Sequence, residues 1–149
     1  MTDHHWYFAY GSNVLLQQMH ERTGDVYHAV RCELRGYRLA FNKDSVRWGV
    51  AANIVVDDDH SVWGVAYQMD AASLLTMDGF EPGYRRTAVT VHTHHTNART
   101  SLTAVAYISD NIREDLAPPV EYLEKILRGA RQHGLPAHYV EHVRLSAGL

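Results

Sequence analysis

The chain has 149 residues, of which 46% are hydrophobic and 21% charged, as is typical of one soluble domain (residues 1–149) with a single core. Its formal net charge of -3 argues against nucleic acid or an anionic membrane as the main partner, and no apolar run approaches the roughly 20 residues that cross a bilayer. Cys32 is the only cysteine, which excludes an intrachain disulfide and, with no basic and apolar N-terminal leader, favours a cytoplasmic location.

An aromatic stretch near the N-terminus predicts a buried strand that turns directly into a helix. Residues 6–10 are apolar, Gly11 interrupts them, and Ser12 and Asn13 are favoured helix N-cap residues. The apolar residues that follow have helical spacing. Because the first turn of a helix has unpaired N–H groups, this turn can bind a carboxylate or an oxyanion. An ordinary capped helix without a ligand is the alternative.

The middle of the chain predicts short strands separated by turns. These strands cover residues 26–34, 36–41, 51–56, 61–69, 84–93 and 101–109. Residues 42–49 are polar and are predicted to be a loop. Asp57 to His60 are predicted to form a solvated hairpin turn, because their acids lack the alternating ligand spacing of a calcium loop.

Three further helices complete the predicted elements. Asp70 is expected to cap a helix over residues 71–77, Gly134 to end a helix over 120–133, and Pro136 to start a last one near 137–145. Because helices do not alternate regularly with the strands, a doubly wound sheet is disfavoured. The predicted fold class is α+β: a small, mixed, closed or nearly closed β-barrel of about six strands with flanking helices.

Few residues are candidates for catalysis. No phosphate loop, serine elbow or Cys–His pair is present, and Cys32 is predicted to be a structural residue. Glu81 follows Phe80 and precedes Pro82. This context allows two interpretations: a carboxylate packed against apolar side chains, with a raised pKa, or a solvated loop glutamate. Histidines 92, 94 and 95 raise the alternative of a metal site, but no further ligands are specified.

Several segments, in order and at matching spacing, resemble the γ-glutamylcyclotransferase family over roughly residues 6 to 140. They are Tyr7 to Asn13, Leu34 to Phe41, Ala52 to Ile54, Val62 to Val65, Met77 to Glu81, and Gly129-Ala130 with Gly134 to Pro136. The resemblance implies a small mixed barrel with flanking helices. It also implies release of 5-oxoproline from a γ-glutamyl substrate without a cofactor or a metal.

The resemblance assigns roles to particular residues. Glu81 corresponds to the family's catalytic glutamate, a general acid and base that ends a Leu-Asp-x-x-Glu pattern, here Met77 to Glu81. The other expected substrate-binding residues belong to the opening motif or match the family's pocket tyrosines. They are Tyr7, Phe8, Ala9, Tyr10, Gly11, Ser12, Asn13, Tyr84, Tyr107 and Tyr122. The alternative for Tyr84, Tyr107 and Tyr122 is an ordinary position in the core.

Two alternatives to the enzyme remain. One is a non-catalytic module of the same fold that binds a γ-glutamyl or other small anionic ligand. The other is a metal hydrolase that uses His92, His94 and Asp57 to Asp59. Pro82 departs from the glycine that commonly follows the family glutamate, which leaves substrate choice open, a carrier-bound γ-glutamyl group included. A homodimer is also left open.

Overall fold

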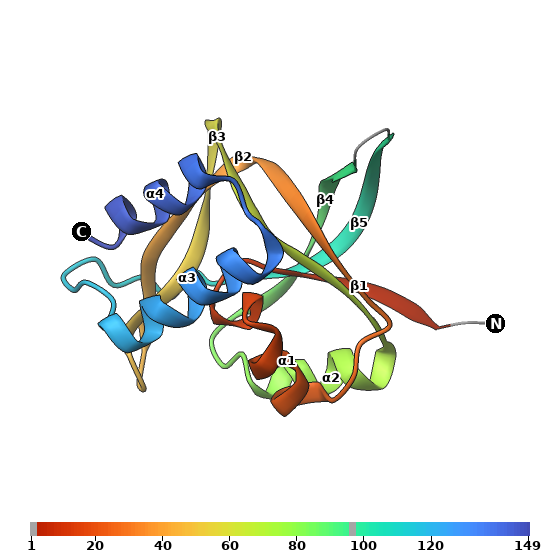
Figure 1. Cartoon of the computed structure of the whole chain (residues 1–149). Helices are drawn as coiled ribbons and strands as arrows, with labels where there is room; N and C mark the ends of the chain where they lie inside the picture. The colour runs from red at the N-terminus through yellow and green to blue at the C-terminus, as the bar shows by residue number, and fades with distance from the viewer. Residues whose placement is uncertain (1–2, 96–97) are drawn as a thin grey trace.

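Five strands close into a barrel in the computed structural model, which describes residues 3–95 and 98–149 (Figure 1). The strands are β1 (His4–Ala9), β2 (His28–Ser45), β3 (Gly49–Asp70), β4 (Arg85–His95) and β5 (Ala98–Ile108). They follow one another around the barrel as β1-β3-β2-β4-β5. Neighbours are antiparallel except β1 and β5, whose parallel contact at Tyr7 and Val105 closes the barrel. The predicted mixed barrel is confirmed, with five strands instead of about six.

The strand count is lower because β2 and β3 each run through a predicted break. Arg35 pairs with Ser61 and Tyr37 with Val56, so four residues of β3 lie opposite the single residue Gly36 of β2, which has φ +83°. The acidic tract 57–60 is therefore a wide bulge within one long strand, and the predicted hairpin turn is wrong. Its exposure to solvent is as expected.

A second bulge lies further along the same pair of strands. Ala40 pairs with Asn53 but Lys43 pairs with Ala51, so the ladder skips Ala52. Beyond this bulge β2 continues to Ser45, and only residues 46–48 turn. The loop predicted over 42–49 is therefore mostly strand. Local sequence could not reveal this, because a bulge is defined by the partner strand.

Helices cover the outside of the barrel. They are η1 (Ser12–Val14), a single 3-10 turn, α1 (Leu16–Thr23), α2 (Ala71–Gly79), α3 (Val120–His133) and α4 (Ala137–Ser146). Helices α1 and α2 lie side by side near the label of β1, and α3 and α4 lie on the other side (Figure 1). The predicted signals hold: Asp70 Oδ1 accepts from Ser73 N at 2.8 Å, and Gly134 ends α3 at φ +64°.

The prediction that Ser12 and Asn13 cap the first helix is wrong. Gly11 precedes η1, Leu15 precedes α1, and neither makes a side-chain cap hydrogen bond. The polar side chains of Ser12 and Asn13 instead bond to other side chains. They are therefore available to the site described below.

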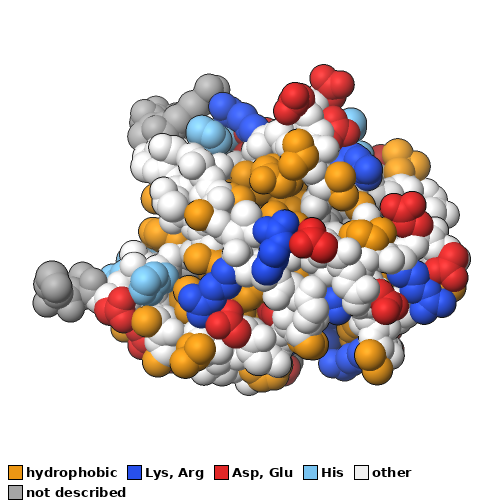
Figure 2. All heavy atoms as spheres, turned by 180° about the vertical axis from the view of Figure 1, so that it is seen from behind, with side chains coloured by type: hydrophobic (Ala, Val, Ile, Leu, Met, Phe, Trp, Pro, Cys, Tyr) orange, Lys and Arg blue, Asp and Glu red, His pale blue; other side chains and the backbone are white. Residues whose placement is uncertain are grey.

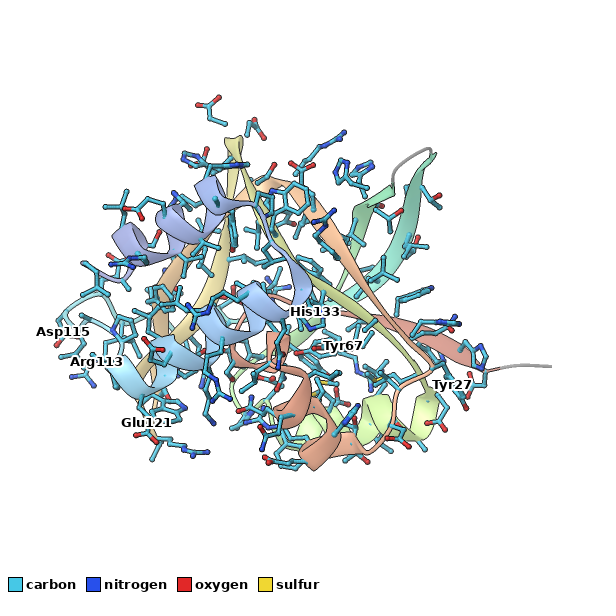
Figure 3. All side chains as sticks on the ribbon, viewed as in Figure 1. Tyr27, Tyr67, Arg113, Asp115, Glu121 and His133 are labelled. Carbon is cyan, nitrogen blue, oxygen red and sulfur yellow. The ribbon has the colours of Figure 1, made fainter. Side chains whose placement is uncertain are left out.

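The η1 turn is fixed from both sides by the barrel and by α3. Tyr67 of β3 donates from its hydroxyl to the carbonyls of Asn13 (2.8 Å) and Val14 (3.1 Å), and its ring lies beside His133 of α3 (Figure 3). A Cβ at Gly129 would lie 2.6 Å from the backbone of Val14. Glycine at that position therefore lets the backbone of α3 touch the turn directly.

The face shown in Figure 2 carries acidic and basic side chains in mixture, in keeping with the small net charge. One continuous cluster of buried apolar residues fills the barrel and extends under the helices. Among the described residues, no helix has the length and hydropathy of a membrane-crossing segment.

Candidate active site

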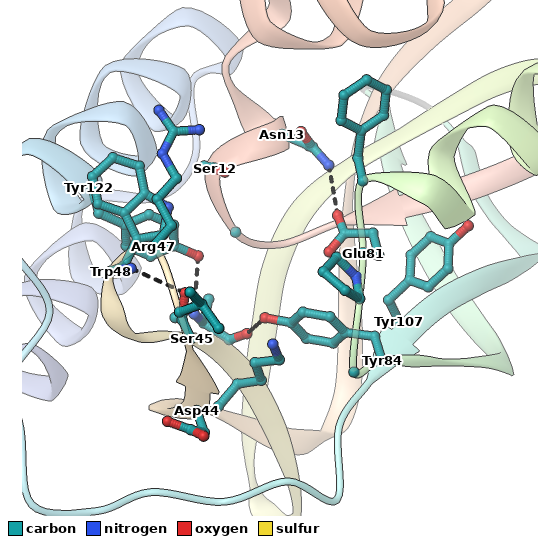
Figure 4. A pocket seen from close by; sticks show the side chains of 18 of the residues that line it. Ser12, Asn13, Asp44, Ser45, Arg47, Trp48, Glu81, Tyr84, Tyr107 and Tyr122 are labelled. Carbon is teal, nitrogen blue, oxygen red and sulfur yellow. Dashed lines mark hydrogen bonds between the residues drawn. The ribbon is translucent and has the colours of Figure 1, made fainter.

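A cavity of about 590 Å³ opens where η1, the β2–β3 turn and the α2–β4 connection meet (Figure 4). It collects most of the predicted site residues from distant parts of the chain. Those that line it are Tyr7, Tyr10, Gly11, Ser12, Asn13, Glu81, Tyr84, Tyr107 and Tyr122. Phe8 and Ala9 do not line it, since their side chains are buried in the core.

The catalytic candidate, Glu81, is positioned by a tight turn after α2. Its N–H donates to the carbonyl of Asp78 at 3.2 Å, and its own carbonyl accepts from Tyr84 N at 3.2 Å. Pro82 and Gly83 fill this turn, with Gly83 at φ +83°, so proline after the glutamate is accommodated by a following glycine. The turn directs Glu81 into the cavity, where its side chain is only 14% exposed.

The carboxylate of Glu81 has few polar contacts. Asn13 Nδ2 donates to its Oε1 at 3.0 Å (Figure 4). Arg22 Nη1 lies 3.9 Å from the same oxygen. Burial raises the pKa of Glu81 to about 7, against the opposing effects of Arg22, Lys43 and the Asn13 hydrogen bond. A carboxyl group in this state both accepts and donates protons near neutral pH.

Both polar atoms of the Asn13 side chain are hydrogen-bonded. Its Nδ2 also donates to the Tyr7 hydroxyl at 2.9 Å, and its Oδ1 accepts from Gln18 Nε2 (2.8 Å) and Arg22 Nη1 (3.0 Å). The residue is 3% exposed. With its oxygen occupied by two donors, the amide is constrained to present N–H to Glu81.

The second bulge places two of the tyrosines. Because Ala52 is skipped by the ladder, its N–H donates to the Tyr122 hydroxyl at 2.9 Å, and its carbonyl accepts from the Tyr84 hydroxyl at 2.6 Å. Burial raises the pKa of both phenols, so they stay neutral and act as hydrogen-bonding groups. The cavity wall is thus built from a backbone irregularity and two phenols.

Asp78, three residues before Glu81, is in the opposite electrostatic state. Arg86 donates to both of its carboxylate oxygens at 2.8 Å, and the Tyr107 hydroxyl donates to Oδ1. The hydrogen bonds from Arg86 hold the pKa of Asp78 below its usual range. Asp78 therefore remains ionised and anchors Tyr107, whereas Glu81 is free to exchange protons.

Sequence reasoning missed the cationic side chains of the cavity. Arg22 is in the last turn of α1, Lys43 follows the second bulge, and Arg47 lies in the β2–β3 turn. The helical spacing that predicted α1 carries no information about a carboxylate 59 residues away. A bulge that cannot be read from one strand likewise hides the direction of Lys43.

The other sequence candidates are structural. Burial raises the pKa of the Cys32 thiol to about 12, so it is unreactive, as expected. His94 contacts Glu33 at 3.0 Å, and Asp57 contacts His60 and Arg38. Within residues 3–95 and 98–149 no three such side chains gather into a metal-binding group, and the side chain of His95 lies outside the described part.

The sequence is similar to a known family and to known proteins. Residues 61–143 match the sequence model of the AIG2-like family. The chain is 30% identical over 144 residues to "Gamma-glutamylcyclotransferase" of Mus musculus, covering 93% of this chain and 76% of the relative. It is 32% identical over 142 residues to the protein of the same name from Bos taurus, covering 89% and 73%.

A solved structure described as "Gamma-glutamyl cyclotransferase" has the same fold. It superposes with a TM-score of 0.85 at 29% identity, over 95% of this chain and 86% of that one. The resemblance read from the ordered sequence segments is thereby confirmed. The chain belongs to the AIG2-like family, and it is a homologue of γ-glutamylcyclotransferases.

Proposed function

We propose that this protein is a γ-glutamylcyclotransferase that converts a γ-glutamyl compound into 5-oxoproline and a free amine or amino acid. The observation that carries the proposal is one carboxyl group, Glu81, buried in a cavity with its pKa raised to about 7. A glutamate that only bound an anionic ligand would repel that ligand when ionised. A glutamate poised between its two forms suits proton transfer.

In the proposed reaction, Glu81 first acts as a base. The α-amine of the substrate is protonated near neutral pH, and the Glu81 carboxylate removes one proton so that the amine can attack the γ-carbonyl carbon. The new C–N bond closes a five-membered lactam. The protonated Glu81 then donates to the leaving nitrogen as its bond to the γ-carbon breaks. The second proton of the attacking amine also passes to the released amine, which leaves as an ammonium ion.

Orientation is the remaining contribution of the protein. Ring closure within one molecule requires the substrate to be held folded, and good orientation is worth on the order of 7–11 kcal/mol. In the proposal, the Gly11–Asn13 turn faces the γ-glutamyl group, and its backbone N–H groups bind a carboxylate or the developing oxyanion. A Cβ at Gly11 would lie 3.2 Å from Ala52 Cβ and 3.3 Å from the Tyr122 hydroxyl, so a side chain there would crowd this wall.

The buried and unreactive state of Cys32 is compatible with the cytoplasmic location expected from the sequence.

The test is release of 5-oxoproline from γ-glutamyl amino acids, γ-glutamylamines and glutathione by the parent protein and by Glu81→Gln. We expect turnover by the parent with at least one class and a loss of kcat on the order of a thousandfold in the variant. Glutamine keeps an oxygen for the Asn13 N–H, so the variant should fold.

Glu33→Gln is the matched control, because Glu33 is also a half-buried glutamate but lies outside this cavity. It should retain full activity. No 5-oxoproline from any compound would contradict the enzyme. If Glu81→Gln then still bound a γ-glutamyl ligand, the protein would instead be the non-catalytic binding module.

A further inference from the structure

Lys43 is a buried cation at the wall of the catalytic cavity. The residue is 7% exposed, and its side chain lies near Gly83 and over the ring of Tyr84, with Nζ 5.1 Å from the ring centroid. It contributes to the electrostatic environment of Glu81, whose pKa it lowers. The reaction proposed above gives Lys43 no task.

The ammonium group of Lys43 has no anionic partner. Among the residues that the structure describes, its Nζ donates no hydrogen bond, and no carboxylate oxygen lies within ion-pair distance of it. The nearby acid Asp44 instead faces Arg113 at 3.8 Å. A buried cation that lacks a partner is costly to the folded protein, so its presence points to an anion that arrives with a ligand.

The fold directs Lys43 into this position. It is the first residue of β2 to rejoin the ladder after the second bulge, and bulges next to functional sites redirect side chains. The chain continues from Lys43 through Asp44 to the fully exposed Val46. Lys43 therefore stands at the inner end of the wall that leads from the interior of the cavity to its opening.

We propose that Lys43 is a specificity-determining residue that binds a carboxylate on the leaving group, so that this protein prefers γ-glutamyl amino acids to γ-glutamylamines. The inference rests on the proposed cyclotransferase reaction. The departing part of the substrate must face the opening in order to leave, and it therefore runs along the wall that starts at Lys43. A γ-glutamyl amino acid carries a carboxylate on that part, whereas a γ-glutamylamine carries none.

The sharpest test uses two substrates that differ only in this group, γ-glutamyl-L-alanine and γ-glutamylethylamide. The parent should have a kcat/KM on the order of tenfold or more higher for the alanine compound, as expected for a charge-assisted hydrogen bond. Lys43→Met, which keeps the apolar stem, should remove most of this preference. Measured at pH 8.5, where Glu81 is ionised in both proteins, it should do so by lowering kcat/KM for the alanine compound while leaving the ethylamide within about threefold of the parent.

Arg35→Met is the matched control, because Arg35 is an exposed cation outside the cavity. It should keep the preference of the parent. Equal turnover of the two substrates by the parent would overturn the inference without any variant. An equal loss on both substrates in Lys43→Met would also overturn it, since Lys43 would then act on the γ-glutamyl part or on Glu81. Absence of turnover in the parent would instead overturn the proposed function.

Discussion

Two hollows of similar size lie along β2 and β3, one at the turn that joins the strands and one near the middle of both. The first, of about 590 Å³, holds Glu81, and the second, of about 530 Å³, lies between the wide bulge of β3 and α4 and holds Glu33, His60 and His142. Each contains a glutamate. In the second hollow, burial is outweighed by hydrogen bonds from Ser61, His94 and Arg35, and the pKa of Glu33 is lowered.

The comparison teaches that the hydrogen-bond and ion-pair partners of the glutamate, more than the size of the hollow, decide which chemistry is possible there. Glu33 has a histidine at 3.0 Å and an arginine at 3.4 Å, so its charge is already compensated. Glu81 has one amide at 3.0 Å and a guanidinium only at 3.9 Å, so burial dominates. A compensated carboxylate stabilises the fold, whereas an undercompensated one is held ready for proton transfer.

The largest effect that would sharpen this contrast is expected from Asn13→Leu. The change removes the hydrogen bond from Asn13 to the Glu81 carboxylate and leaves Gln18 and Arg22 without their shared acceptor. We expect kcat/KM to fall about a hundredfold or more, and the pKa of Glu81 to rise, because the Asn13 hydrogen bond lowers it.

Asn53→Leu is the control for this prediction. Asn53 is as deeply buried but bonds to Asn42 and Ser109 and does not line the cavity. It should destabilise the protein while leaving the activity per folded molecule and its pH profile close to those of the parent. An Asn13→Leu enzyme with more than a tenth of the parent activity would break the contrast.

A smaller effect is expected in the pH profile. Because Glu81 must be ionised to accept the first proton, kcat/KM should rise with pH to a plateau, with a midpoint near 7. Arg22→Met removes the cation that most lowers this pKa, so the midpoint should move to higher pH and activity at pH 6.5 should fall about threefold to tenfold.

Arg144→Met, which removes an exposed arginine paired with Glu141 on α4, should leave the midpoint in place. A profile of the Arg22 variant that is lowered equally at every pH would show that Arg22 acts only by holding Asn13.

The smallest effect is on stability, and its sign should differ between the two hollows. Folding raises the pKa of Glu81, so between about pH 4.3 and 7 the folded protein binds more protons than the unfolded one, and stability falls as pH rises. Glu81→Gln should therefore raise the free energy of unfolding by about 1–3 kcal/mol at pH 8 and by nearly nothing below pH 4.

Folding lowers the pKa of Glu33, so its contribution is present at neutral pH and is lost as pH falls through that lowered pKa. Glu33→Gln should therefore lower the free energy of unfolding at pH 8, by less than about 1 kcal/mol. Urea titrations of both variants at pH 4 and pH 8 measure these changes. If the free energy of unfolding changed in the same direction in both variants at pH 8, the two carboxylates would not differ as described.

Much of the fold was predictable because its signals are local. Asp70 caps α2, Gly134 ends α3 in the left-handed conformation, and β4 and β5 lie close to their predicted ranges. The two bulges were not predictable, because each depends on how residues of β3 pair with β2. Where local patterning met a bulge, one strand was divided into two.

The site was less predictable than the fold. Local sequence does not distinguish Glu81 from a solvated loop glutamate, and only the resemblance to a family singled it out. Asn13 and Glu81 are 68 positions apart in the sequence, so their hydrogen bond could not be predicted from local patterns. Local preference predicted instead that Asn13 caps a helix. Arg22 and Lys43 reach the cavity through tertiary packing and a bulge, for which single-sequence periodicity has no signal.

The direct contact of Gly129 with the backbone of Val14 has a consequence for binding entropy. A loop held by side chains can loosen whenever those side chains change rotamer, but a loop pressed against a helix backbone moves only with the helix. The Gly11–Asn13 wall is therefore ordered when the protein folds, before any ligand arrives. A substrate that binds there would lose only its own conformational freedom, which leaves more of its interaction energy to hold the bent shape from which the ring closes.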